Sequence, residues 1–134
     1  MYNETITYYS KKPFNKFEMD NYDVEYFEEN ELCWDDLKIF LKIKNNIIEN
    51  WSFTGDTAII TTACWWVYWE SIIWKTLEDV LTLEYEYIVE LIEEEVSDRR
   101  KKASVLALLT TRNAIHKYLW DWIVDDFEDV IPNL

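Results

Sequence analysis

Two cysteines and the aspartates near them are the residues of this sequence that could do chemistry. Cys33 and Asp35 lie two positions apart, so a thiolate and a carboxylate could reach one metal ion from a single short segment. We expect Cys33 in a loop rather than in an apolar stripe, which favours a functional thiol. Closed zinc sites use four ligands, and iron clusters are bound by thiolate or imidazole, so a tight site here needs further donors.

Two further residues could complete such a site, and each has a structural alternative. Asp56 precedes a predicted helix, where it could supply a ligand oxygen or cap the helix N-terminus. Cys64 lies inside that apolar helix, where it could be a ligand or a small core residue. The single histidine, His116, is predicted near the end of a long helix, and we interpret it as a favourable residue at the helix C-terminus.

A basic run stands at the predicted start of that long helix: Arg99, Arg100, Lys101 and Lys102. Cations in the first turn oppose the helix macrodipole, so something should compensate them. One interpretation is salt bridges to the acidic cluster at 93–95. The other is a positive rim that lowers the pKa of Cys33 or receives an anionic sulfur donor or partner.

The elements that must position these residues indicate an α+β fold in a single domain over residues 1–134. Apolar and polar residues alternate at 22–26 and 37–44, the period of half-buried strands. Asn45 and Asn46 supply turn residues, and a third strand at 47–53 completes a three-stranded antiparallel sheet. A C-terminal set of helices should pack on one face of that sheet.

From residue 56 onward the apolar period lengthens to that of helices. Ser97 is predicted to cap a long helix over 98–119, and a short acidic helix is predicted over 123–130. Acidic residues gather at 20–31, 84–98 and 121–129, and no basic residue accompanies the last cluster. These clusters are either solvated faces or a docking surface for a basic partner.

Composition excludes several classes of function. The 134 residues carry a net charge of −14, which opposes binding to nucleic acid or to an anionic membrane surface. The longest apolar run, at 63–69, is far short of the roughly 18 residues of a membrane span. Two cysteines form no disulfide framework, so reduced thiols in the cytoplasm are expected. With one histidine and no glycine-rich phosphate loop, the chain is not expected to be an enzyme.

Glycine and tryptophan occur in unusual numbers. Glycine averages about 7% of residues, or roughly nine here, yet the sequence holds one glycine and eight tryptophans. Trp74 and Trp120 stand where helices are predicted to end, positions at which a left-handed backbone favours glycine. Either these tryptophans occupy glycine positions, for instance because a UGA codon meant as glycine was read as tryptophan, or the core is rich in tryptophan.

Four segments resemble the iron–sulfur scaffold family of IscU, SufU and the NifU N-terminal domain. Residues 30–39, Asn-Glu-Leu-Cys-Trp-Asp-Asp-Leu-Lys-Ile, are similar to its Asn-Pro-x-Cys-Gly-Asp-x-hydrophobic-Lys motif, with Trp34 at the glycine. Residues 47–55 resemble its third strand, and 72–79 its Gly-Lys-Thr-Leu segment. Residues 103–107, Ala-Ser-Val-Leu-Ala, resemble the start of its last long helix.

The resemblance implies a scaffold or carrier that binds a [2Fe–2S] cluster, iron or zinc. Its partners would be a cysteine desulfurase or another sulfur donor and acceptor apo-proteins. Of the family ligands, Cys33 and Asp35 are in register, whereas the second and third cysteines correspond to Ala58 and Ala103. Cys64 lies about 9 Å further along the helix than Ala58. A homo-oligomer could supply the missing ligands. The alternatives are an interaction protein on this fold that has lost the cluster site, or an unrelated acidic adaptor.

Overall fold

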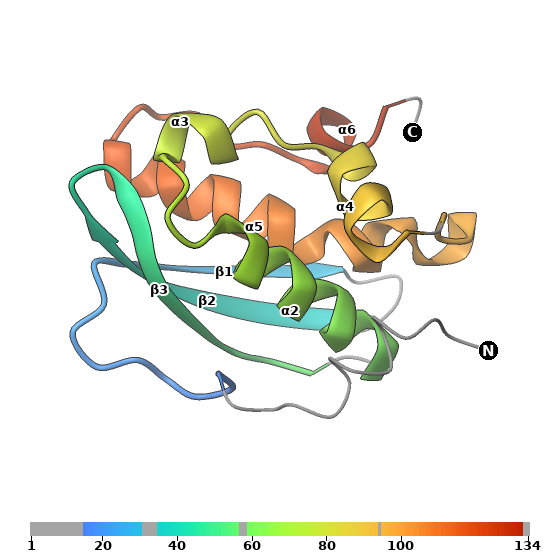
Figure 1. The fold of residues 1–134 in the computed structure, drawn as a ribbon, viewed down its shortest axis with the longest axis horizontal. Helices are drawn as coiled ribbons and strands as arrows, with labels where there is room; N and C mark the ends of the chain where they lie inside the picture. The colour runs from blue at the N-terminus through green and yellow to red at the C-terminus, as the bar shows by residue number, and fades with distance from the viewer. Residues whose placement is uncertain (1–14, 31–34, 57–58, 94, 133–134) are drawn as a thin grey trace.

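The computed structural model describes residues 15–30, 35–56, 59–93 and 95–132, which form a sheet followed by helices. The strands are β1 (Val24–Asn30), β2 (Asp35–Lys44) and β3 (Ile47–Thr54). The helices are α2 (Ile59–Ile72), α3 (Leu77–Val80), α4 (Tyr85–Ile92), the 3-10 turn η1 (Asp98–Arg100), α5 (Lys101–Leu119) and α6 (Phe127–Val130). Figure 1 shows α2 and α5 running side by side along the strands. The predicted α+β fold is confirmed.

The sheet is an antiparallel meander in the order β1-β2-β3. The apolar residues of the predicted alternation in β2 are all buried: Leu37, Ile39, Leu41 and Ile43. Asn45 and Asn46 have φ angles of 53° and 65°. Both are left-handed, as a two-residue hairpin turn of type I′ requires, and asparagine tolerates this conformation.

Two helices cover the sheet and form the core with it. α5 lies against β1 and β2, and α2 lies against α5. On α2, the Trp65 ring is 6.1 Å from that of Phe53, and the Trp69 ring is 4.8 Å from that of Trp51. Most residues of α2 whose side chains the structure describes are buried, because a helix that is apolar all round must be enclosed.

Two predicted helix boundaries are wrong. Ser97 precedes the 3-10 turn and makes no side-chain cap hydrogen bond, so the α-helix begins only at Lys101. The Asp98 carboxylate instead pairs with the Lys101 ammonium at 3.2 Å within this tightened turn. The acidic helix predicted over 123–130 is restricted to α6, because Asp126 accepts hydrogen bonds from the first-turn amides and starts the helix late. Among the described residues, no helix has both the length and the apolar character to cross a bilayer.

Candidate metal site and the surrounding geometry

The predicted ligand segment connects the end of β1 to the start of β2. Asn30, the last residue of β1, pairs with Asp35, the first residue of β2, and both are buried. Cys33 and Trp34 lie between them and outside the described residues. Figure 1 shows that the start of β2, the end of β3 and the starts of α2 and α5 are at the same end of the molecule. The elements predicted to carry the site residues therefore begin or end at this end of the molecule.

Asp56 follows β3 and is joined to the start of β2 by two hydrogen bonds. The Asp36 amide donates to the Asp56 carbonyl oxygen at 3.1 Å, and the Asp56 amide donates to the Asp36 carboxylate at 3.0 Å. Gly55 makes this approach possible, because its φ is 140° and a Cβ there would overlap the backbone carbonyl oxygen of Asp36. The structure thus brings Asp56, with an exposed side chain, next to the strand that Asp35 begins.

Cys64 lies in the second turn of α2 and is 4% exposed. Its neighbours in the core cluster include Trp65 and Val67 on the same helix. This is the environment expected of the core-packing alternative for Cys64.

The basic run at the start of α5 is held at the same end of the sheet as Asp35. The Trp65 indole donates to the Ala103 carbonyl oxygen at 2.9 Å, which fixes the start of α5 against α2. Lys101 contacts Asp98, and the hydrogen bond to this carboxylate raises the pKa of the lysine.

The remaining members of the run differ in their surroundings. The Lys102 ammonium lies 5.4 Å from the centre of the Phe127 ring. Arg100 is exposed, and the side chain of Arg99 lies outside the described part of the structure. Among the described side chains, the ion pair of this run joins Lys101 to Asp98. Glu94 and the side chain of Arg99 lie outside the described part, so salt bridges to the cluster at 93–95 stay a prediction.

Within residues 15–30, 35–56, 59–93 and 95–132, no group of three or more histidine, cysteine, aspartate and glutamate side chains is arranged to hold a metal ion. Cys33 is not among these residues. The described part therefore contributes carboxylates, Asp35 and Asp56, near the segment that carries the thiol.

Sequence reasoning missed a buried charge network at the opposite end of α5. His116 Nδ1 is 2.7 Å from the Asp121 carboxylate, and its Nε2 is 3.1 Å from that of Asp125. Arg112 Nε donates to the same Asp125 oxygen at 2.9 Å. His116 lies in the last turn of α5, as predicted, but it is buried and contacts two aspartates. The inference that no basic residue faces these aspartates is wrong. The missed signal was the i, i+4 spacing of Arg112 and His116, which puts both on one helix face.

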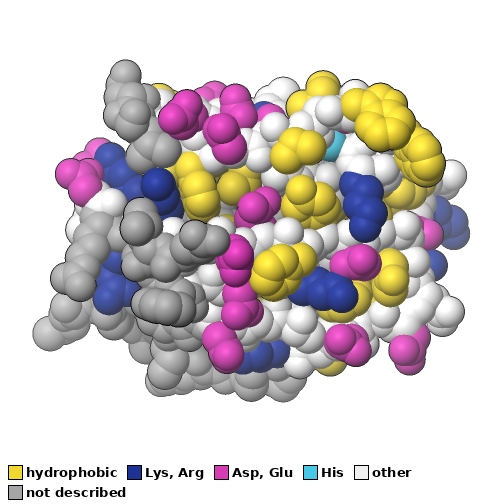
Figure 2. All heavy atoms as spheres, turned by 180° about the vertical axis from the view of Figure 1, so that it is seen from behind, with side chains coloured by type: hydrophobic (Ala, Val, Ile, Leu, Met, Phe, Trp, Pro, Cys, Tyr) yellow, Lys and Arg dark blue, Asp and Glu magenta, His cyan; other side chains and the backbone are white. Residues whose placement is uncertain are grey.

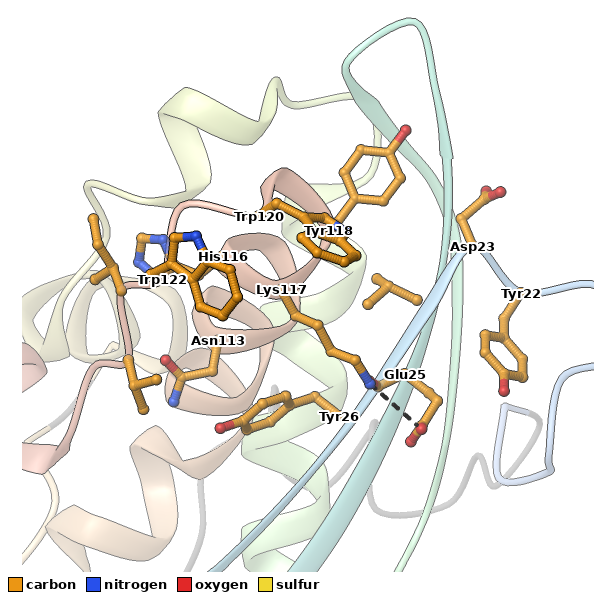
Figure 3. Close-up of a pocket in the computed structure, with 13 residues that line it drawn as sticks. Tyr22, Asp23, Glu25, Tyr26, Asn113, His116, Lys117, Tyr118, Trp120 and Trp122 are labelled. Atoms are coloured by element: carbon orange, nitrogen blue, oxygen red, sulfur yellow. Dashed lines mark hydrogen bonds and ion pairs between the residues drawn. The ribbon is translucent and has the colours of Figure 1, made fainter.

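A cavity of about 710 Å³ lies beside this network, between β1 and the end of α5. Figure 3 shows Lys117 reaching across it to Glu25, and the two charged atoms are 3.6 Å apart. Asp121 lies next to it, and its pKa is lowered because the Ile123 amide and His116 both hydrogen-bond to its carboxylate. The walls are mostly apolar. Asp23, Glu25 and His116 line the cavity, but no group of three or more metal-ligating side chains among the described residues is arranged there to hold a metal ion.

Solved structures share this fold. A protein named as an iron–sulfur cluster assembly scaffold of the SUF system, from Fervidobacterium islandicum AW-1, is 21% identical, with a TM-score of 0.74 over 85% of this chain and 96% of that one. The N-terminal part of a nitrogen-fixing NifU-like protein from Brucella abortus is 12% identical, with a TM-score of 0.71 over 89% and 94%.

The remaining comparisons concern the sequence itself. No curated protein matches the chain. Residues 1–121 match the family of NifU-like N-terminal domains. The matched part contains the two strands on either side of Cys33 in the sequence and nearly all of the helical layer. With its fold and most of its length accounted for in this way, the chain belongs to the NifU-like N-terminal domain family.

Proposed function

We propose that this protein is an iron–sulfur cluster assembly scaffold or carrier that binds iron or a [2Fe–2S] cluster at a reduced ligand set. Zinc is the alternative metal. Members of the family are non-catalytic scaffolds. The observation that supports the proposal is the position of Asp35, two residues after Cys33 in the sequence, at the start of β2 and at the end of the sheet where Asp56 and the basic start of α5 also lie.

The ligand set supports weak, transferable binding. Cys33 and Asp35 supply one sulfur and one oxygen, and Asp56 is a further carboxylate held beside the start of β2. Alanine stands at 58 and 103, where the family has its other cysteines. Because the number of ligands sets affinity, a two- or three-ligand site should release its metal readily. Release is what a carrier requires.

The proposed partners follow from the same role. A cysteine desulfurase or another sulfur donor would deliver sulfur, and apo-proteins would accept the assembled cluster in the cytoplasm. Arg100 is exposed at the end of the molecule that carries the proposed site, where a positive side chain could meet an anionic donor. A second copy of the chain could supply the missing ligands.

Anaerobic reconstitution tests this proposal. Wild type, Cys33→Ala, Asp35→Ala and Cys64→Ala would each be incubated with iron and sulfide, desalted, and measured for iron, zinc, sulfide and visible absorption. We expect wild type and Cys64→Ala to retain metal that a chelator removes quickly. Cys33→Ala should retain almost none, and Asp35→Ala an intermediate amount. Cys64→Ala is the matched control, because it removes the other thiol from a buried position.

The second candidate function is that of an interaction protein that has lost the cluster site. Alanine at 58 and 103 favours it, because two of three family cysteines are absent. Equal and negligible metal in wild type and Cys33→Ala would support this candidate and reject the scaffold proposal.

A further inference from the structure

Of the seven tryptophans that the structure describes, three have a backbone conformation that bulky residues rarely adopt. The φ angles of Trp74, Trp120 and Trp122 are 72°, 58° and 63°. In this left-handed region the Cβ of an L-residue approaches the following carbonyl oxygen, so glycine predominates there, with some asparagine. The asparagines at positive φ in this chain, Asn45 and Asn46 among them, follow that rule. The tryptophans do not.

Trp120 occupies a helix-ending motif that normally requires glycine. Its amide donates to the Lys117 carbonyl oxygen at 3.3 Å, and the Asp121 amide donates to that of His116 at 3.4 Å. These two bonds are the pair that defines the Schellman motif, in which the residue at the position of Trp120 is left-handed and usually glycine. The prediction of a glycine position at 120 is confirmed in its geometry.

Trp74 and Trp122 stand at two other sharp reversals. The Trp74 amide donates to the Ile48 carbonyl oxygen at 2.9 Å, where the chain leaves α2 and returns to the start of β3. Trp122 lies at the centre of a turn in which the Ile123 amide donates to the Asp121 carboxylate at 2.9 Å. Both are turn positions with φ above zero, where glycine has no steric cost.

The side chains of these residues contribute little that would offset the backbone strain. Trp74, Trp120 and Trp122 are 70%, 75% and 86% exposed. By contrast, the tryptophans of β3 and α2 are at most 3% exposed and form the core: Trp51, Trp65, Trp66 and Trp69. The alternative of a tryptophan-rich core is thus correct for this second group only. Trp34 lies outside the described residues.

We infer that positions 74, 120 and 122 are glycine in the protein as its own cell makes it, the codons written as tryptophan being decoded as glycine. Two independent observations agree. One is the shortage of glycine: the sequence holds one where roughly nine are usual, and glycine at these three positions would raise the count to four. The other is the left-handed backbone at exposed turns. The inference does not depend on metal binding.

The inference changes the interpretation of the surface beside the cavity. Figure 2 shows hydrophobic side chains gathered near the histidine, and Trp120 and Trp122 are the most exposed large apolar residues of the described structure. Figure 3 shows both at the cavity beside His116. With glycine at these two positions, this apolar surface loses its two most exposed side chains.

Peptide mass spectrometry of the protein isolated from its natural source tests the inference, together with the codons at the three positions. We expect UGA codons and peptides with glycine masses at 74, 120 and 122. Tryptophan mass at any of these positions overturns the inference.

A second measurement tests the physical reason. Recombinant Trp120→Gly should unfold at higher urea concentration than the chain with tryptophan, whereas Trp120→Ala should not, because alanine keeps the Cβ that the left-handed backbone disfavours. Trp69→Gly, at a core position, should unfold at lower concentration. If glycine and alanine at 120 give the same midpoint, the backbone argument fails.

Discussion

Replacing Asp125 with alanine tests the buried network at the end of α5. The Asp125 carboxylate accepts a hydrogen bond from Arg112 at 2.9 Å, lies 3.1 Å from His116 Nε2, and has a side chain that is 9% exposed. Asp125→Ala leaves the Arg112 guanidinium, itself 12% exposed, without its carboxylate. Removing one partner of a buried ion pair costs about 3–5 kcal/mol.

The lower end of that range should apply here. Arg112 keeps its hydrogen bond to the Leu83 carbonyl oxygen at 3.0 Å, so the guanidinium still has one hydrogen-bond partner. We therefore expect a loss of about 3 kcal/mol in the free energy of unfolding, or roughly 10 °C in Tm for a domain of this size. Urea unfolding monitored by circular dichroism would measure the free energy of unfolding of Asp125→Ala and of the two comparison variants below.

Asp126→Ala is the matched control, because it removes the neighbouring carboxylate from an exposed position. Asp126 caps only the four-residue α6, and loss of such a cap costs about 1 kcal/mol. The double variant Arg112→Met/Asp125→Leu should recover most of the loss, because no buried charge is left without a partner. If Asp125→Ala costs no more than Asp126→Ala, the reasoning about the buried pair is wrong.

Three further predictions follow from other parts of the molecule. Gly55→Ala should lower the free energy of unfolding by about 1–3 kcal/mol, since its Cβ would overlap the Asp36 carbonyl oxygen, and urea unfolding would show this. Desolvation raises the pKa of Glu28 in the folded state, so its ionised form is destabilising above that pKa and the penalty vanishes below the ordinary value. Glu28→Gln should accordingly be more stable than wild type at neutral pH, and the two urea midpoints should converge as the pH falls. Trp34→Gly, which restores the Cys-Gly-Asp pattern around Cys33, should retain more iron after reconstitution than the tryptophan form; equal iron content would contradict this.

Local patterns were sufficient to predict the sheet and several chain reversals. The alternation at 37–44 was enough to place β2, because side chains of a strand point to opposite faces at every second residue. The turn at Asn45 and Asn46 followed from residues that tolerate positive φ. The left-handed position at 120 was predicted because the long helix was expected to end there, and helices commonly end at a left-handed glycine. Each of these features depends on neighbours within a few residues.

Contacts between segments distant in sequence were decided only by the tertiary structure. His116 and Arg112 contact Asp125 because the chain turns back after α5. The spacing of apolar residues in the sequence does not predict where such a loop packs. The approach of Asp56 to the start of β2 depends on strand register and on the space left by Gly55. Cys33 and Asp35 were recognisable as a ligand pair from the sequence, since two positions keep them together. Whether a third donor faces them depends on packing, because elements far apart along the chain must supply it.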